Sequence, residues 1–320
     1  MMQPSGQPVQ AVLLYDNAAA FDAAFGDLFV LDARLKSALK DYGPWQSLKG
    51  YNTPNNLGLS SETRHITVQR FDTQMPLDGF ADVLGNPVVA NLQADLVSAI
   101  TGHQRALLLE VGPGSVPGFT SALQSSGIAA NLDGLDDPAM GLAEGQSDYE
   151  DRLAIAQYSV ISTLPEASIS AIHWVQSQQV FEPGSFSKIA SQGFSTPLYC
   201  GPFLFGGEQT ADGAVKAGVR GLGSQNLLGK MVIFKPHTQN WTDSYQQMLT
   251  FITYCRSIGR VLGDDETFST DTRDAPVIHV RHKNDIPQLP EGYIELSRDD
   301  HMTAGERSGL VSKLFGKFRR

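Results

Sequence analysis

Apolar residues along the chain follow two alternating patterns, short continuous runs and longer segments with one apolar residue every three or four positions. The run at 9–15 predicts a buried strand. Asn17 follows it as a helix N-cap, and Gly43 with Pro44 marks the end of the helix. Between them the apolar residues recur at helical spacing, as Phe21, Phe25, Leu28, Leu31, Leu35 and Leu39. This part of the chain therefore predicts a strand, a turn and one amphipathic helix.

The order strand, turn and helix is repeated three more times. The predicted pairs are 106–111 with 116–124, 169–175 with 184–190, and 231–234 with 242–258. In the last pair the apolar side of the helix consists of Tyr245, Met248, Leu249, Ile252 and Cys255. Gly259 ends this helix. A further helix, opened by the capping box from Ser147 to Glu150, runs to about residue 164 before Pro165.

Two more apolar runs, 66–69 and 276–280, predict strands that no helix follows. Because some predicted strands are followed by helices and others are not, the sequence favours an α+β fold with a mixed β-sheet and repeated strand-turn-helix units. The repetition is also compatible with two similar lobes. We expect 51–62 to be a surface loop. The Gly-, Ala- and Asp-rich stretch 127–146 suggests a boundary. The predicted divisions are an N-terminal lobe at 1–146, a C-terminal lobe at 147–287, a linker at 288–304 and a basic amphipathic tail at 305–320.

The segment 170–177, Ser-Ala-Ile-His-Trp-Val-Gln-Ser, runs into a Pro-led helix start at 180–186. Together they resemble a bacterial family catalogued as domain of unknown function 4261. The resemblance extends more weakly over 88–284. It implies a fold and no catalytic residues, and it implies a weak preference for protein binding near toxin and immunity functions.

Composition limits the classes of protein to consider. The 320 residues are 41% hydrophobic, enough to bury a sizeable core. No run approaches the roughly 18 apolar residues of a membrane-spanning helix, and 1–6 lacks the features of a signal peptide, so we expect a cytoplasmic protein. The net charge of −10 argues against a nucleic-acid partner. Cys200 and Cys255 are too few for a disulfide framework, and Cys255 reads as a small buried hydrophobe.

Three short motifs suggest chemistry but lack essential residues. Gly229 and Lys230 would end a phosphate loop, but Ser224 occupies the position of the first glycine and Met231 replaces the magnesium-binding Ser or Thr. The run 221–223 has only two glycines of a dinucleotide fingerprint and precedes a strand. Ser115 has prolines where a nucleophile elbow needs glycines, so a turn is the better interpretation.

Histidines and acidic residues offer the remaining enzymatic candidates. His279 and His282 are three apart, but the residues around His279 predict a strand, where residues three apart face opposite ways, so the two should not share a metal. His173 and Trp174 are the candidate pocket residues, although a histidine ending a buried strand is more often a hydrogen-bonded structural residue. The acids at 264–266 read as a solvated turn. We therefore expect no metal site and no cofactor.

The C-terminal tail is the best candidate for binding a partner. Its apolar face holds Leu310, Val311, Leu314, Phe315 and Phe318, with Lys313, Lys317, Arg319 and Arg320 beyond it. This pattern is typical of a peptide that folds on an anionic membrane surface or in the groove of a partner. The alternative is a tail that docks on its own acidic body, or that stays disordered. Gly309 and Gly316 weaken any helix there.

The sequence as a whole favours a non-catalytic protein-binding or scaffolding protein of a bacterial cell, with an unidentified protein partner and a link to toxin neutralisation or secretion. The alternative is a hydrolase-like enzyme whose site is assembled by the fold from scattered residues such as His173, Asp264 and His279. A tight pocket with two or more titratable groups would favour the enzyme, and a broad apolar or acidic patch would favour the binding protein.

Overall fold

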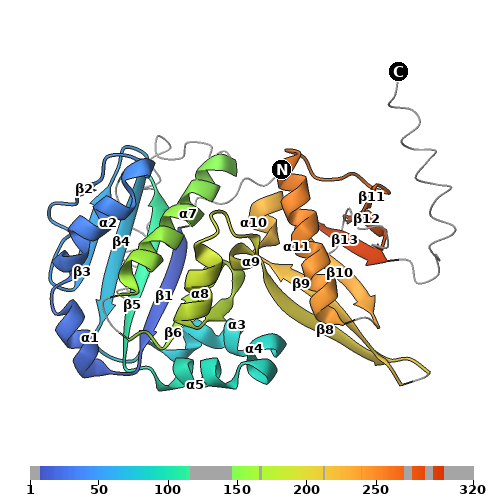
Figure 1. Ribbon diagram of the computed structural model, residues 1–320, viewed down its shortest axis with the longest axis horizontal. Helices are drawn as coiled ribbons and strands as arrows, with labels where there is room; N and C mark the ends of the chain where they lie inside the picture. The colour runs from blue at the N-terminus through green and yellow to red at the C-terminus, as the bar shows by residue number, and fades with distance from the viewer. Residues whose placement is uncertain are drawn as a thin grey trace, which may run out of the picture. The chain divides into compact units, whose positions relative to one another are not determined.

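The computed structural model describes residues 8–115, 146–165, 168–211, 213–238, 240–269, 276–284 and 291–298 (Figure 1). These residues form two compact units. The first contains the described residues up to Leu204 together with Gly221–Gly229, and the second contains Phe205–Arg220 and the described residues from Lys230 onward. Helices and strands occur in both, so the predicted α+β class is confirmed.

The first unit is built on a seven-stranded sheet of order β2-β3-β4-β5-β1-β6-β7. Its strands are β1 (Val9–Tyr15), β2 (Gln46–Ser47), β3 (Asn56–Ser60), β4 (Arg64–Phe71), β5 (Arg105–Pro113), β6 (Ala171–Trp174) and β7 (Gln179–Phe181). Every neighbouring pair is antiparallel. The α-helices are α1 (Ala18–Phe25), α2 (Asp32–Ala38), α3 (Ala81–Leu84), α4 (Pro87–Leu92), α5 (Ala94–Gly102), α7 (Gln146–Thr163), α8 (Pro183–Ala190), α9 (Thr196–Tyr199) and α10 (Ser224–Leu228). Short 3-10 turns are η1 (Leu28–Leu31), η2 (Lys40–Tyr42), η3 (Leu77–Phe80) and η4 (Val175–Ser177).

Helices cover both faces of this sheet, which explains why β1 is apolar almost without interruption. On one face, residues of β1, β5, β6 and β7 form a cluster with side chains from η3, α3, α4 and α5. On the other face Tyr15 packs against Phe21 of α1, with ring centroids 4.7 Å apart, and Trp174 packs against Phe186 of α8. Helix α7 also contacts β1 and β5 and crosses the front of the sheet in Figure 1.

The second unit contains a six-stranded sheet of order β11-β12-β13-β10-β9-β8. Its strands are β8 (Gly201–Gln209), whose first residues belong to the first unit, β9 (Val215–Leu222), β10 (Met231–His237), β11 (Thr267–Phe268), β12 (Ile278–Lys283) and β13 (Tyr293–Arg298). Strands β10 and β13 are parallel, whereas β12 pairs antiparallel with both β11 and β13, so this sheet is mixed. Helix α11 (Trp241–Ser257) packs on β10.

Most predicted elements are present. The strands predicted at 9–15, 66–69, 106–111, 169–175, 231–234 and 276–280 correspond to β1, β4, β5, β6, β10 and β12, and the predicted helices at 147–164, 184–190 and 242–258 correspond to α7, α8 and α11. Cys255 is buried as expected. The helix predicted at 116–124 lies outside the described residues.

Three predictions need correction. The single helix expected after Asn17 is broken after Phe25, where the Asp27 carboxylate accepts a hydrogen bond from the Phe29 backbone N–H and opens η1. The surface loop expected at 51–62 contains β3, because its apolar residues pair across to β4 and enter the core. Within the linker expected at 288–304, Tyr293–Arg298 form β13 in the middle of the second sheet.

The predicted lobe boundary at 146 also differs from the division that the structure shows. Strand β6 pairs with β1, and α7 packs on β1 and β5. Residues on both sides of 146 therefore share one sheet and one core, and the units separate near Leu204 instead.

Candidate functional site

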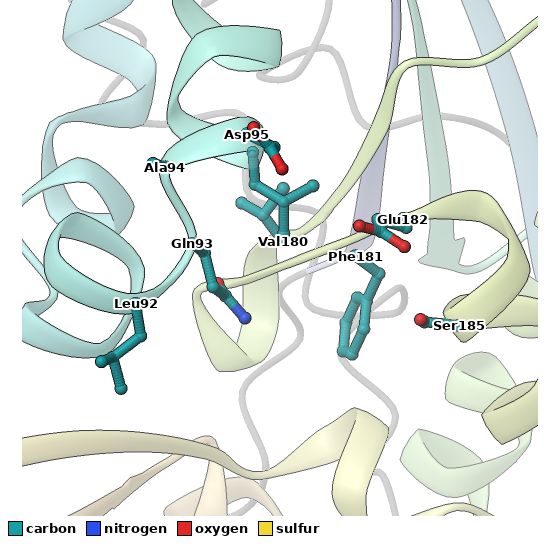
Figure 2. Close-up of a pocket in the computed structure, with 9 residues that line it drawn as sticks. Leu92, Gln93, Ala94, Asp95, Val180, Phe181, Glu182 and Ser185 are labelled. Carbon is teal, nitrogen blue, oxygen red and sulfur yellow. The ribbon is translucent and has the colours of Figure 1, made fainter.

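A cleft of about 260 Å³ opens in the first unit where the joint between α4 and α5 meets β7 and the start of α8 (Figure 2). The lining residues are Leu92, Gln93, Ala94, Asp95, Leu96, Val180, Phe181, Glu182 and Ser185. They come from two segments far apart in the sequence. The fold of the first unit brings them together.

The local sequence explains why both segments bend at the cleft. Gln93 has φ −132° and ψ 50°, which is not helical, so α4 ends at Leu92 and α5 starts at Ala94. On the other side Glu182 is extended, and Pro183 begins α8 at the position where a fixed φ suits a helix. The first turns of two helices therefore open at the cleft.

A carboxylate stands at the N-terminal end of each helix. Asp95 lies in the first turn of α5 and Glu182 is the N-cap residue of α8, and both are exposed. The partial positive charge of each helix N-terminus stabilises its own carboxylate, which reduces the negative potential that a ligand would meet. The cleft is acidic at its rim, although less strongly than two isolated carboxylates would make it.

The floor of the cleft is apolar. Val180 and Phe181 of β7 are 3% and 9% exposed, and Figure 2 shows them between Gln93 on one side and Ser185 on the other. Leu92, at the rim, is 61% exposed, more than any other large apolar side chain among the described residues. A lone exposed leucine on a surface needs no explanation, but this one borders an apolar floor.

Strand β7 is the last strand in the order of the first sheet. Among the described residues it pairs with β6 alone, with Val180 opposite His173 and Phe181 opposite Ile172. The outer edge of such a strand presents backbone N–H and C=O groups on which another strand can form. The cleft therefore combines residues of an end strand, an apolar floor and an acidic rim.

The candidate pocket residues His173 and Trp174 are neighbours of this strand but do not line the cleft. Trp174 is fully buried, as expected, and its ring lies 6.0 Å from that of Tyr199. His173 is 5% exposed and lies 5.3 Å from the Phe80 ring. Burial lowers the pKa of His173 to about 4, and its Nδ1 has no hydrogen-bond partner among the described residues. A neutral imidazole buried in an apolar core fits a structural role, but the hydrogen bond expected of this histidine is not found at Nδ1 among the described residues.

The other residues of the enzymatic alternative lie in the second unit. The Asp264 carboxylate accepts a hydrogen bond from the His282 backbone N–H at 2.7 Å, so it closes a turn. The His282 ring bonds the Leu262 carbonyl at 2.8 Å. His279 pairs with Ser297 across β12 and β13. Each of these contacts has a structural role in the turn or sheet that contains it.

Two further features bear on chemistry. Among the described residues, no three His, Cys, Asp or Glu side chains gather as a metal site would require. Both cysteines are buried, and burial raises the pKa of the Cys200 thiol to about 12, so this thiol stays protonated at neutral pH.

A largely buried polar row that was not predicted crosses the first sheet. Gln10 and Thr67 stand opposite Glu110 on neighbouring strands, and the Gln10 side-chain amide donates to the Glu110 carboxylate at 2.8 Å. Tyr51 forms a hydrogen bond with Thr67. His65, on the same face of β4 as Thr67, donates from Nδ1 to the Gly114 carbonyl at 3.0 Å, and burial lowers its pKa. These groups satisfy one another within the fold.

The proposed partner-binding residues Leu310, Lys313, Leu314, Phe315, Lys317 and Phe318 lie outside the described residues. The cleft residues were not predicted from the sequence at all. Only Pro183, which marks a helix start, hinted at a bend beside the cleft.

Comparisons of this chain with protein-family models, with curated proteins and with solved structures found no match in any of the three. The resemblance to domain of unknown function 4261 therefore stays a prediction. Within the described part of the chain, no helix combines the length and the apolar character needed to cross a membrane.

Proposed function

We propose that this chain is a non-catalytic protein-binding or scaffolding protein, and that the cleft beside β7 holds an extended segment of its partner. The segment would carry an apolar residue next to a lysine or arginine. The observation that carries the proposal is the combination, in one cleft, of an edge strand, an apolar floor and two exposed carboxylates.

The size of the cleft supports a side chain as its occupant. At about 260 Å³ it is smaller than the roughly 300–1,000 Å³ of pockets that enclose small-molecule ligands. An extended peptide needs no enclosing pocket, because its backbone pairs with the strand edge and only alternate side chains enter the protein. In this arrangement the backbone of β7 supplies affinity, and the cleft selects the side chain.

The chemistry of the rim supports a basic and apolar segment. Leu92 and Phe181 would contact an aliphatic or aromatic side chain, or the methylene stem of a lysine. Asp95 and Glu182 lie within the same cleft and would favour a cationic end group. The net charge of −10 adds a long-range attraction for basic partners, which speeds their encounter at low salt.

Selection from a random peptide library displayed on phage tests this proposal without knowledge of the partner. The wild-type protein is the bait, and the double variant Leu92→Ser, Glu182→Lys is used for counter-selection. Both side chains are exposed, so the double variant should fold. We expect the recovered peptides to be enriched in Lys or Arg beside an apolar residue, and to bind the double variant at least about tenfold more weakly.

The matched control is the double variant Leu77→Ser, Glu62→Lys, which makes the same chemical changes at exposed positions that do not line the cleft. It should bind the selected peptides as the wild type does. Methylation of alternate backbone amides in a selected peptide should abolish binding, because it removes donors needed for strand pairing. Peptides that bind the cleft variant as tightly as the wild type, or that show no basic enrichment, would refute the proposal.

A further inference from the structure

The second sheet has two unlike faces. On one face the alternate residues of its central strands are buried almost completely, and α11 packs on this sheet (Figure 1). The buried residues are Val232 and Phe234 of β10, Ile294 and Leu296 of β13, and Ile278 and Val280 of β12. Helix α11 contributes Met248, Leu249, Ile252 and Cys255 to its own buried side.

The residues between them point to the opposite face and form three rows set by the strand register. The rows run Lys283, Tyr293 and Met231, then Arg281, Glu295 and Ile233, then His279 and Ser297. Lys235 lies two residues beyond Ile233 on β10 and therefore points to the same face. Each of these side chains is partly or fully exposed, although β13 and β10 are interior strands of the sheet. Helix α11 is the only helix described in the second unit.

Apolar residues occupy outward positions of this face where a sheet exposed to water usually has polar ones. Met231 and Ile233 are successive residues of β10 on this face, and Tyr293 of β13 lies opposite Met231. Together they make an apolar strip across two neighbouring strands. Such a strip on a sheet face indicates a contact surface.

Cationic side chains flank the strip. Arg281 is 58% exposed, Lys283 is 39% exposed and Lys235 is exposed, whereas Glu295 is only 16% exposed. The ion pairs of this face are long. Arg281 Nε lies 3.8 Å from the Asp265 carboxylate and Lys283 Nζ lies 3.9 Å from that of Glu295, beyond hydrogen-bonding distance. Ion pairs this long contribute little when the cation is exposed or half-exposed, so Arg281 and Lys283 remain available to a partner.

From this face we infer a docking surface for an acidic protein segment in which carboxylates alternate with apolar side chains. The outer face of β12, β13 and β10, here called the basic face, is a cationic surface in a chain whose net charge is −10. Alternation matters because an extended segment presents successive side chains to opposite sides, and its apolar residues would lie on the strip of Met231, Ile233 and Tyr293.

A protein segment fits the basic face better than a nucleic acid does. Glu295 lies within the face and Asp265 beside Arg281, where they would repel the continuous charge of a phosphate backbone. Tyr293 is the only Phe, Tyr or Trp residue in the three rows, whereas single-stranded nucleic acids bind through several stacked aromatic rings. The surface is independent of the cleft beside β7, and its test does not depend on that cleft.

Fluorescence anisotropy with two labelled probes tests the inference. One probe is a synthetic peptide that repeats Glu-Val-Asp-Phe, and the other is a single-stranded oligothymidylate. The double variant Arg281→Glu, Lys283→Glu reverses the charge of the basic face, and Lys49→Glu, Lys188→Glu is the control with the same net charge and exposed positions in the first unit. Circular dichroism melting confirms that both are folded.

We expect the acidic peptide to bind the wild type and the control alike, and to bind the face variant at least about tenfold more weakly. Arg281→Gln with Lys283→Gln should give an intermediate loss that shrinks in high salt. Tyr293→Ala should weaken binding without any change in charge, which separates a defined surface from general attraction to acids. Equal loss in the control, or no effect of Tyr293→Ala, would overturn the inference. Tighter binding of the oligothymidylate than of the peptide would overturn it as well.

Discussion

Buried His173 should make the first unit less stable in mild acid. Burial lowers the pKa of His173 to about 4, whereas the same group in an unfolded chain has its ordinary value of 6.5. Between these two values the unfolded chain binds a proton that the folded protein excludes, so stability is fully retained above the unfolded pKa and falls as the pH drops toward 4. The expected loss is about 2 kcal/mol at about pH 5, and it approaches about 3 kcal/mol near pH 4.

Urea unfolding over a pH series, for the wild type and for His173→Leu, measures this effect. Leucine fits the apolar surroundings of His173, next to Phe80, and it does not titrate. The lowered pKa of His65 contributes a similar acid dependence in both proteins, so it cancels in the difference. The difference in unfolding free energy should shift in favour of His173→Leu by about 2 kcal/mol between about pH 7.5 and pH 5. A difference that stays constant with pH would show that the ring is not buried in its neutral form.

Three other predictions concern stability and the tail. Trp174→Ala should lower the unfolding free energy by about 3–5 kcal/mol by urea denaturation, because the indole is fully buried, and an unchanged midpoint would contradict that burial. Asn17→Ala should cost about 1 kcal/mol, and Asn17→Ser much less, because the Asn17 side chain accepts a hydrogen bond from the Ala20 backbone N–H at 3.0 Å. Deleting 305–320 should leave the melting temperature nearly unchanged while abolishing capture of anionic vesicles or of a partner, and an earlier melt with no loss of capture would contradict the tail hypothesis.

Hydrophobic periodicity predicted elements well where it continued without interruption. In α11 four of the five expected apolar side chains, Met248, Leu249, Ile252 and Cys255, are at most 5% exposed, and Tyr245 is half-buried. The broken helix after Asn17 shows what hydrophobic periodicity does not predict. Leu28, Leu31, Leu35 and Leu39 are all fully buried although they belong to different turns and helices, so the spacing predicted burial correctly and continuity incorrectly. Gly26 and the capping Asp27 marked the break.

Strand β3 was missed because its own residues favour a loop. Asn56, Gly58 and Ser60 are poor strand formers, yet Leu57 and Leu59 are buried between them by pairing with β4. Glycine is required at position 58, because a Cβ there would lie 2.7 Å from the Tyr51 ring. Residues 56–60 form a strand because they pair with β4, and the local sequence pattern of 56–60 does not indicate that pairing.

The cleft could not be predicted from the sequence either, because it too depends on contacts between segments that are far apart in the chain. His173 and Trp174, which the sequence indicated as a candidate pocket, are buried in the core beside β7. The cleft depends on β7 being the last strand of its sheet, and on the α4–α5 joint lying against that strand. The order of strands in this sheet depends on how all segments of the first unit pair with one another. Among the described residues β7 has no second strand neighbour, and nothing in the sequence of β7 itself predicts that position in the sheet.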